Sequence, residues 1–262
     1  MSLLLDGLRD AAMGLLSLFF IITAVPAAEG VPESVRDWET LWTKVLQRNV
    51  DEAGRIDFKS LLRDHDDLDR VVAFIAANDP NSQPGKFPGR AARLGYYINA
   101  YNALAMYGVV DARLPEYLGG LRKFTFFYLR KFSIGGKWIS LYEFENDVIR
   151  PIGEEKIHFA LNCMVVGCPR LPREAFTASE LEHQLDVTTR KFIGETRNVR
   201  VDSKNRTVWL SAIFKFYIED FLAHAPSLVA YVNEFRADKI LTDFEVQFME
   251  YDWTVNSQTE RR

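Results

Sequence analysis

One short segment holds both cysteines of the chain and one of its four histidines. His158, Cys163 and Cys168 lie within residues 156–169, KIHFALNCMVVGCP, which are otherwise almost wholly apolar. A thiol beside an imidazole can be a nucleophile with its base, because a nearby imidazole favours the thiolate form. Two cysteines with four residues between them can instead form a local disulfide, next to a histidine that only fills the core. The spacing leaves both interpretations open.

The segment from Ile157 to Cys163 is typical of a buried strand. On a strand, His158 and Cys163 point to opposite faces, so Cys163 at the strand's end, or Cys168 in the loop beyond, must curl back to reach the imidazole. The amides of the loop at Gly167 could then bind an oxyanion. A third residue would orient the imidazole ring, and the candidates within reach are Glu145, Asn162, Asn99 and Asn102.

Two asparagines and one arginine are candidate binding residues. Asn99 and Asn102 fall inside a strongly apolar helix expected over residues 90–110, where a buried amide is costly without a partner. They either bond to neighbouring backbone, supporting the segment that contains His158, or line a ligand site. Arg150 ends a short acidic helix just before Pro151, so it either pairs with Glu145 or Asp147 or binds an anionic substrate group.

No metal site and no cofactor are expected. Two cysteines and His158 supply at most three ligands for zinc. The other histidines, which are His65, His183 and His224, fall in charged stretches without the paired spacing of structural zinc sites.

The pattern of apolar residues predicts an α+β fold with a helical N-terminal half and a small antiparallel sheet flanked by helices. Helical periodicity marks residues 34–50, with Ser34 as the N-cap, and one or two further helices over 58–78. Two hairpins are expected: residues 124–134 with 137–140 around the Gly135-Gly136 turn, and 199–201 with 207–210. Further helices are expected over 141–150, 178–192 and 213–223.

The first 28 residues have the layout of an export segment. Ala11 to Ala28 carry no charge and end in small residues, and a polar stretch follows, so cleavage near Ala27 is expected. Asp6 and Asp10 against a single Arg9 depart from the usual positive start of such a segment, and an uncleaved membrane anchor is the alternative. Either way the folded part is expected to be exported, periplasmic or envelope-associated, where disulfides persist.

Length and charge favour one domain over residues 34–256, followed by a polar tail over 257–262. The 262 residues are 48% hydrophobic, enough for a sizeable core. A net charge of −4 with scattered cations excludes a nucleic-acid footprint, which needs clustered Lys and Arg. The expected partner is a peptide-like or small-molecule ligand, with membrane association through the N-terminal segment as a further option.

Several motifs occur in an order that resembles the bacterial and plant family known as domain of unknown function 547. They are YINAYNA at 97–103, GGKWISL at 135–141, FENDVIR at 144–150, IHFALNC at 157–163 with GCP at 167–169, LSAIFKFYIEDF at 210–221 and YDWTVN at 251–256. The resemblance implies that Asn99, Asn102, Glu145, Arg150, His158, Cys163 and Cys168 belong to one site. This chain departs from the family at Asn146, where many members carry histidine. The arrangement is also distantly similar, by analogy, to papain-like and transglutaminase-like thiol hydrolases.

Two functions are therefore weighed. In the first, a thiolate at Cys163 or Cys168, paired with His158 and oriented by Glu145 or an asparagine amide, performs acyl transfer or hydrolysis on a peptide-like substrate. In the second, the protein is a non-catalytic ligand-binding or envelope-interaction domain with a Cys163–Cys168 disulfide. The state of the two thiols separates them, since a disulfide removes the nucleophile.

Overall fold

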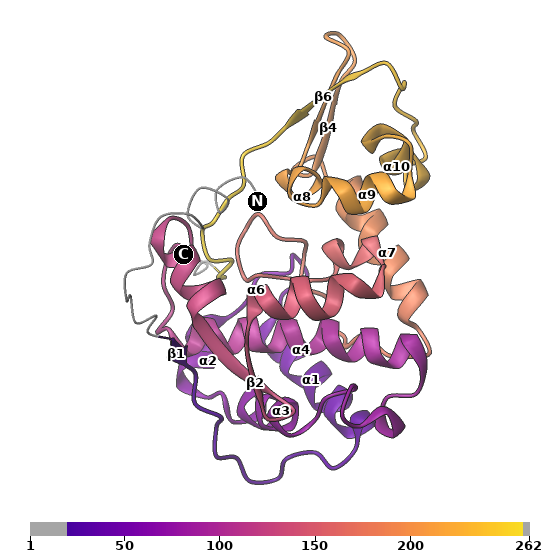
Figure 1. The fold of residues 1–262 in the computed structure, drawn as a ribbon. Coiled ribbons are helices and arrows are strands. Elements are labelled where there is room, and N and C mark those ends of the chain that lie inside the picture. Colours follow the sequence, from indigo (N-terminus) through magenta and orange to yellow (C-terminus); the bar gives the residue numbers. More distant parts are fainter. Residues whose placement is uncertain (1–19, 259–262) are drawn as a thin grey trace, which may run out of the picture.

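The structure is a computed structural model that describes residues 20–258. Most of the expected export segment, residues 1–19, and the last four residues lie outside the described part. The fold is α+β, as the sequence predicted, with helices packed around two small sheets (Figure 1). Within the described residues, no helix is long and apolar enough to cross a membrane.

The N-terminal half is helical, and its centre is a single long helix. Helices α1 (Val35–Asn49), α2 (Phe58–Arg63) and α3 (Asp66–Ala77) surround α4 (Gly89–Asp111), in which every residue from Leu94 to Val110 is buried. Ser34 caps α1 by accepting the amide N–H of Asp37, as predicted. Because α4 is enclosed on all sides, any polar group that it carries must find a partner inside the protein.

The first sheet lies beside these helices and has the order β1-β2-β3. Its strands are β1 (Ile21–Ile22), β2 (Arg130–Ile134) and β3 (Lys137–Ser140), with β1 parallel to β2 and β2 antiparallel to β3. In the second sheet, β4 (Val199–Asp202) is antiparallel to β5 (Thr207–Leu210), which is parallel to β6 (Glu245–Phe248). Both hairpins are therefore confirmed, whereas a single antiparallel sheet was wrong: there are two sheets, and each gains one parallel strand.

The remaining helical elements lie between and after the strands. Before β2 are α5 (Leu121–Phe124) and the π-helical turn η3 (Thr125–Leu129). After β3 follow α6 (Leu141–Glu143), η4 (Phe144–Ile149), η5 (Arg150–Ile152) and η6 (Glu155–Phe159). The later helices are α7 (Leu181–Gly194), α8 (Ala212–Phe216), α9 (Ile218–His224) and α10 (Leu228–Glu234), and a short turn, η2 (Pro84–Lys86), precedes α4.

Two expected strands are partly or wholly helical. Residues 124–129 are helical, as the last residue of α5 and the π-helical turn η3, and Phe126 and Phe127 are both buried there. The expected strand from Ile157 to Cys163 is instead the 3₁₀ turn η6 followed by a loop. This segment connects two hydrophobic clusters, since Ile157 packs in the large one around α4 and Phe159 in a smaller one around α9 and α10.

The glycine pair in the β2–β3 turn offers a test of the fold. Gly135 and Gly136 have φ angles of +54° and +82°, so alanine is strained at either position by about 1–2 kcal/mol. A Cβ at Gly136 would meet nothing within 4 Å, but one at Gly135 would lie 2.5 Å from the Cβ of Asp79. We expect Gly135→Ala to lower the free energy of unfolding by at least about 1 kcal/mol more than Gly136→Ala in urea titrations. Equal losses would contradict the packing of this turn on Asp79.

Candidate functional site

A cavity of about 70 Å³ lies between the two hydrophobic clusters and contains most of the predicted site residues. This volume holds a few water molecules or a small chemical group. Its walls come from α4, α5, η3, α6, η4, η6 with the loop after it, α8 and the C-terminal segment. They comprise Tyr101, Lys123, Phe127, Tyr128, Tyr142, Glu145, His158, Leu161, Cys163, Cys168, Pro169, Ile213, Phe216, Tyr217, Tyr251 and Trp253. Of the predicted residues, Glu145, His158 and both cysteines line the cavity, whereas Asn99, Asn102 and Arg150 do not.

His158 is held by a carboxylate that the sequence analysis missed. Its Nε2 lies 2.7 Å from Oδ2 of Asp220 on α9, and its ring stacks on Tyr217 at a centroid distance of 3.7 Å. Burial alone would raise the pKa of Asp220, but hydrogen bonds from His158 and Arg150 hold that pKa well below its usual range. Because an ionised carboxylate only accepts, Nε2 carries the proton and donates it to Asp220.

Arg150 fixes the carboxylate of Asp220. Its Nε donates to Oδ2 of Asp220 at 2.9 Å and one terminal nitrogen donates to Oδ1 at 2.8 Å, a bidentate pair. The other terminal nitrogen donates to the amide oxygen of Asn146 at 2.6 Å. The expected pairing of Arg150 with Glu145 or Asp147 was therefore wrong, since the cation reaches across to α9 instead.

The second ring nitrogen of His158, Nδ1, is buried and has no hydrogen-bond partner among the described residues. Removal of the ring from water lowers the pKa of His158, although Asp220 counteracts this effect. The imidazole is therefore neutral at neutral pH, with the proton on Nε2 and a free lone pair on Nδ1. A histidine that lines a cavity in this state can act as a general base.

Glu145 does not orient the imidazole, contrary to one of the predictions. Its Oε2 accepts a hydrogen bond from the Tyr101 hydroxyl at 3.0 Å, and its Oε1 accepts one from Tyr217. Burial, followed by the charge of Glu145, raises the pKa of both tyrosines well above the ordinary value. Because Tyr217 also stacks on His158, Glu145 fixes the imidazole only indirectly, by holding the ring that lies against it.

Cys163 and Cys168 form a disulfide at the cavity wall. The amide N–H of Cys163 points at the sulfur of Cys168, 3.0 Å away, and the Tyr251 hydroxyl lies 3.2 Å from both sulfurs. In this state neither cysteine is a thiolate. The same donors would stabilise a sulfur anion if the bridge were reduced, because hydrogen bonds to the charged form lower a thiol's pKa.

The loop that brings the sulfurs together is shaped by Asn162 and Gly167. The Asn162 side chain accepts the amide of Met164 at 2.7 Å and donates to the carbonyl of Pro169 at 2.6 Å, which closes the loop. A Cβ at Gly167 would lie 2.9 Å from the Tyr251 ring, so only glycine fits there. Its N–H already donates to the carbonyl of Asp252, so Gly167 is not the oxyanion donor that its position suggested.

The two asparagines of α4 have different tasks. Asn102 donates to the carbonyl of Ala160 at 3.0 Å and accepts the amide of Asn162 at 2.7 Å, so it supports the segment after His158, as predicted. Asn99 instead exchanges two hydrogen bonds with the backbone of Phe176, at 2.7 and 2.9 Å. Both side-chain amides therefore bond to backbone, which was one of the two interpretations; the other was that they line a ligand site.

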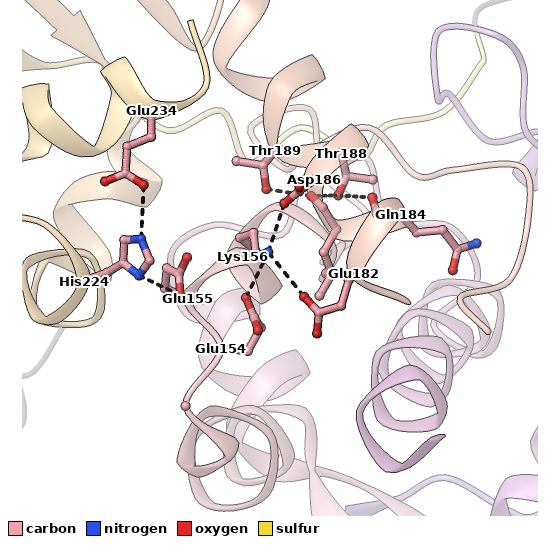
Figure 2. Close-up of polar contacts among 12 residues, drawn as sticks. Glu154, Glu155, Lys156, Glu182, Gln184, Asp186, Thr188, Thr189, His224 and Glu234 are labelled. Carbon is pink, nitrogen blue, oxygen red and sulfur yellow. Dashed lines mark hydrogen bonds and ion pairs between the residues drawn. The ribbon is translucent and has the colours of Figure 1, made fainter. Parts of the chain in front are cut away.

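A charged network holds η6 against its neighbours. Figure 2 shows the Lys156 ammonium between Glu154, Glu182 and Asp186, with its shortest contact, 3.0 Å, to Asp186 on α7. In the same view, His224 on α9 lies between Glu155 and Glu234. These contacts fix the turn that carries His158 between α7 and α9. Within residues 20–258, no cluster of three or more His, Cys, Asp or Glu side chains is placed to hold a metal ion.

Asp220 is the functional residue that sequence reasoning missed, although a signal was present. It lies in the motif LSAIFKFYIEDF, where an acid stands among residues at helical spacing that are otherwise mostly apolar. An acid on such a helix needs a partner, and the nearest candidates in the other motifs were Arg150 and His158. The separation of 62 residues between His158 and Asp220 concealed the pairing.

The depressed pKa values of His158 and Asp220 predict a loss of stability in acid. Below pH 6.5 His158 is protonated in the unfolded chain but stays neutral in the folded state, where its pKa is lower. The unfolded state therefore binds more protons, and the free energy of unfolding falls as the pH falls. We expect His158→Gln to flatten the dependence of unfolding free energy on pH between 7.5 and 5, where one proton contributes at most about 1.4 kcal/mol per pH unit. Urea titrations across this range check it. Identical slopes in the two proteins would show that the imidazole is not kept neutral.

Comparison with known proteins agrees with the family resemblance. No curated protein and no solved structure matches this chain. Residues 86–193, which include α4, the β2–β3 hairpin, His158 and both cysteines, match the family model described as "Protein of unknown function, DUF547". The central part of this chain is therefore a DUF547 domain.

Proposed function

We propose that this protein is a thiol-dependent acyl transferase or hydrolase that acts on peptide-like substrates after its disulfide is reduced. The observation that carries the proposal is the free Nδ1 of a neutral, Asp220-bound His158 in the same cavity as both cysteines. A buried nitrogen without a hydrogen-bond partner costs free energy. Such a nitrogen is explained where a reacting group supplies the missing hydrogen bond.

The roles follow from exposure and contacts. Cys163, the less buried cysteine, is the nucleophile, and Cys168 is the partner that masks it as a disulfide. A dithiol reductant opens the bridge and is itself oxidised. His158 Nδ1 then takes the Cys163 proton, and the thiolate attacks the substrate carbonyl. The leaving amine or alcohol takes the proton back, and water or a second acceptor releases the acyl group from sulfur.

The shape of the cavity is consistent with such a substrate. Aromatic rings form much of its wall, which also includes Cys163, Cys168 and His158. At about 70 Å³ the enclosed part holds only the group around a scissile bond, so the rest of a substrate would lie outside it. Tyr251, which reaches both sulfurs, is positioned to donate a hydrogen bond to the developing oxyanion.

A second candidate is a non-catalytic ligand-binding domain, favoured by the disulfide itself. A bridge that persists under native conditions leaves no nucleophile, and the aromatic cavity then serves only to bind. In that case the reduced thiols would have ordinary reactivity, because His158 would not lower their pKa.

The thiol chemistry is tested by alkylation after reduction. We expect the reduced protein to react with iodoacetamide at Cys163 at neutral pH much faster than a free thiol with a pKa of about 8.5. His158→Ala should slow the reaction at least about tenfold, because the imidazolium stabilises the thiolate. Peptide mass spectrometry identifies the alkylated residue.

A matched control separates the imidazole from general effects of losing a histidine. His183→Ala removes an exposed histidine on α7 that does not line the cavity, so the alkylation rate should stay at the wild-type value. The acyl-transfer proposal fails if His158→Ala, shown to be folded by its thermal transition, alkylates as fast as the wild type. Failure of the native disulfide to open in millimolar dithiothreitol would favour the binding domain.

We also propose that the chain is exported and keeps its N-terminal segment. A disulfide persists in an oxidising compartment. Cleavage near Ala27 would remove β1 and Thr23, a buried residue whose N–H donates to the carbonyl of Lys131 and whose hydroxyl accepts from Arg130. Arg130 is itself buried, so the loss would remove one of its partners.

Intact-mass analysis of protein from the native envelope fraction checks this proposal. We expect a mass that includes β1, the strand that pairs with β2. A mature chain beginning at Ala28 would contradict retention, and recovery of the protein from the cytoplasm alone would contradict export.

A further inference from the structure

We propose that the Cys163–Cys168 disulfide is a site of thiol–disulfide exchange, at which a low-molecular-weight thiol attacks the Cys163 sulfur and leaves a mixed disulfide on it. Cys168 is the resolving cysteine, whose thiolate expels the small thiol again. This activity goes beyond the acyl transfer proposed above and does not depend on it, because the exchange needs only the bridge and a thiol.

The two sulfurs of the bridge differ in access. Cys168 is only 3% exposed and packs in the large hydrophobic cluster, whereas Cys163 is partly buried at the edge of that cluster. Val166, between the two cysteines, is 38% exposed, so the loop that carries the bridge reaches the surface. Exchange begins when a thiolate attacks one of the two sulfurs, and access helps to decide which one. An incoming thiolate therefore meets Cys163 first.

Hydrogen bonds favour the same direction of attack. The sulfur of Cys168 accepts the amide N–H of Cys163 at 3.0 Å and lies 3.2 Å from the Tyr251 hydroxyl, which must be the donor because a disulfide sulfur carries no hydrogen. Among the described residues, the Cys163 sulfur has the Tyr251 contact alone. Hydrogen bonds stabilise a thiolate, and a more stable thiolate leaves faster. Cys168 is therefore the better leaving group.

Charged groups near the bridge are paired and do not decide the direction. Arg197 donates to the carbonyl of Cys168 at 3.3 Å, but it also forms an ion pair with Glu195. Glu145, which lines the same cavity, accepts hydrogen bonds from two tyrosines. The difference between the sulfurs thus comes from their exposure and from the uncharged donors.

The loop is held in shape by bonds that do not involve sulfur. Asn162 closes it with two hydrogen bonds to its backbone, and the amides of Val166 and Gly167 donate to carbonyls of the C-terminal segment. Cys168 therefore stays beside Cys163 after the bridge opens, within reach of a mixed disulfide. A bridge between residues only five positions apart also constrains the unfolded chain less than a long-range one. These features suit a bridge that opens and closes.

The size of the cavity limits the kind of thiol. Both sulfurs line an enclosed space of about 70 Å³, which admits a sulfur atom and a few atoms next to it. The attacking thiol must therefore lie at the end of a narrow, flexible arm. Low-molecular-weight thiols of the cysteine or glutathione kind have this form.

The exchange balances without any other reactant. The small thiolate forms a bond to the Cys163 sulfur, the Cys163–Cys168 bond breaks, and its electron pair leaves on the Cys168 sulfur. If Cys168 then attacks Cys163, the bridge forms again and the small thiolate leaves. If a second small thiolate attacks the outer sulfur instead, it releases Cys163 as a thiolate and a small-molecule disulfide. The protein is then reduced by two electrons, and two small thiols are oxidised.

The test locates the mixed disulfide in the wild-type protein. Full-length protein with its bridge intact is treated with millimolar reduced glutathione at neutral pH, and free thiols are trapped with N-ethylmaleimide after short intervals. Fragment-ion mass spectrometry then locates each group. We expect glutathione on Cys163 and maleimide on Cys168 at least about ten times as often as the reverse. Equal occupancy, a preference for Cys168, or no glutathionylated protein at all would overturn the proposal.

Two matched variants test the resolving role. With oxidised glutathione, Cys168→Ser should hold a stable mixed disulfide, whereas Cys163→Ser should form one at least about tenfold more slowly, because its remaining sulfur is buried. Reduced wild-type protein should end as the internal disulfide, with glutathione released. Equal rates in the two variants, both shown to be folded by their thermal transitions, or lasting glutathione on the wild type would overturn the proposal. No acyl substrate and no substitution of His158 is involved, so acyl transfer and this exchange can fail separately.

Discussion

The contact between the His158 imidazole and the Asp220 carboxylate connects the two halves of this fold. His158 stands between Ile157, which packs in the large hydrophobic cluster, and Phe159, which packs in the smaller one. Its partner Asp220 lies on α9, in the smaller cluster, and is clamped by Arg150 from the η4–η5 segment. A polar group at a junction between two apolar cores needs a hydrogen-bond partner from the protein or from a ligand, because burial without one costs free energy. In this site every group of the Arg150–Asp220–His158 chain is paired except Nδ1.

The remaining parts of the site serve to hold this junction. Glu145 fixes Tyr217, whose ring covers one face of the imidazole, and Asn102 fixes the segment that leads from His158 to the cysteines. Asn162 and Gly167 close the loop so that both sulfurs reach the cavity wall beside Tyr251. Several elements distant in sequence therefore converge on one small volume, and most of their polar side chains act on each other. This is the arrangement expected of a preorganised site, in which supporting residues keep the reacting groups in place.

Regular elements could be predicted from the sequence because their determinants are local. The Ser34 cap and the apolar spacing of α1 predict that helix, and the Gly135-Gly136 pair predicts the β2–β3 hairpin, since both depend on neighbouring residues only. The segment around His158 was wrongly predicted as a strand, because a short apolar run does not distinguish a buried strand from a buried turn. Its η6 conformation is set by two separate clusters that pull Ile157 and Phe159 apart. The strands β1 and β6 could not be predicted, because each is defined by a long-range parallel partner.

In the candidate site, too, only local features could be predicted. Residue types identified His158, Glu145 and the cysteines, which do share a cavity, but the pairing of His158 and Arg150 with Asp220 depends on how α9 packs. The most direct test of the account is the tautomer of His158, read from ¹⁵N NMR of histidine-labelled protein at neutral pH, with His158→Gln assigning the signals. The account predicts a protonated Nε2 and an unprotonated Nδ1. A proton on Nδ1 with a bare Nε2 would contradict it, because the imidazole could then neither donate to Asp220 nor accept a proton in the cavity.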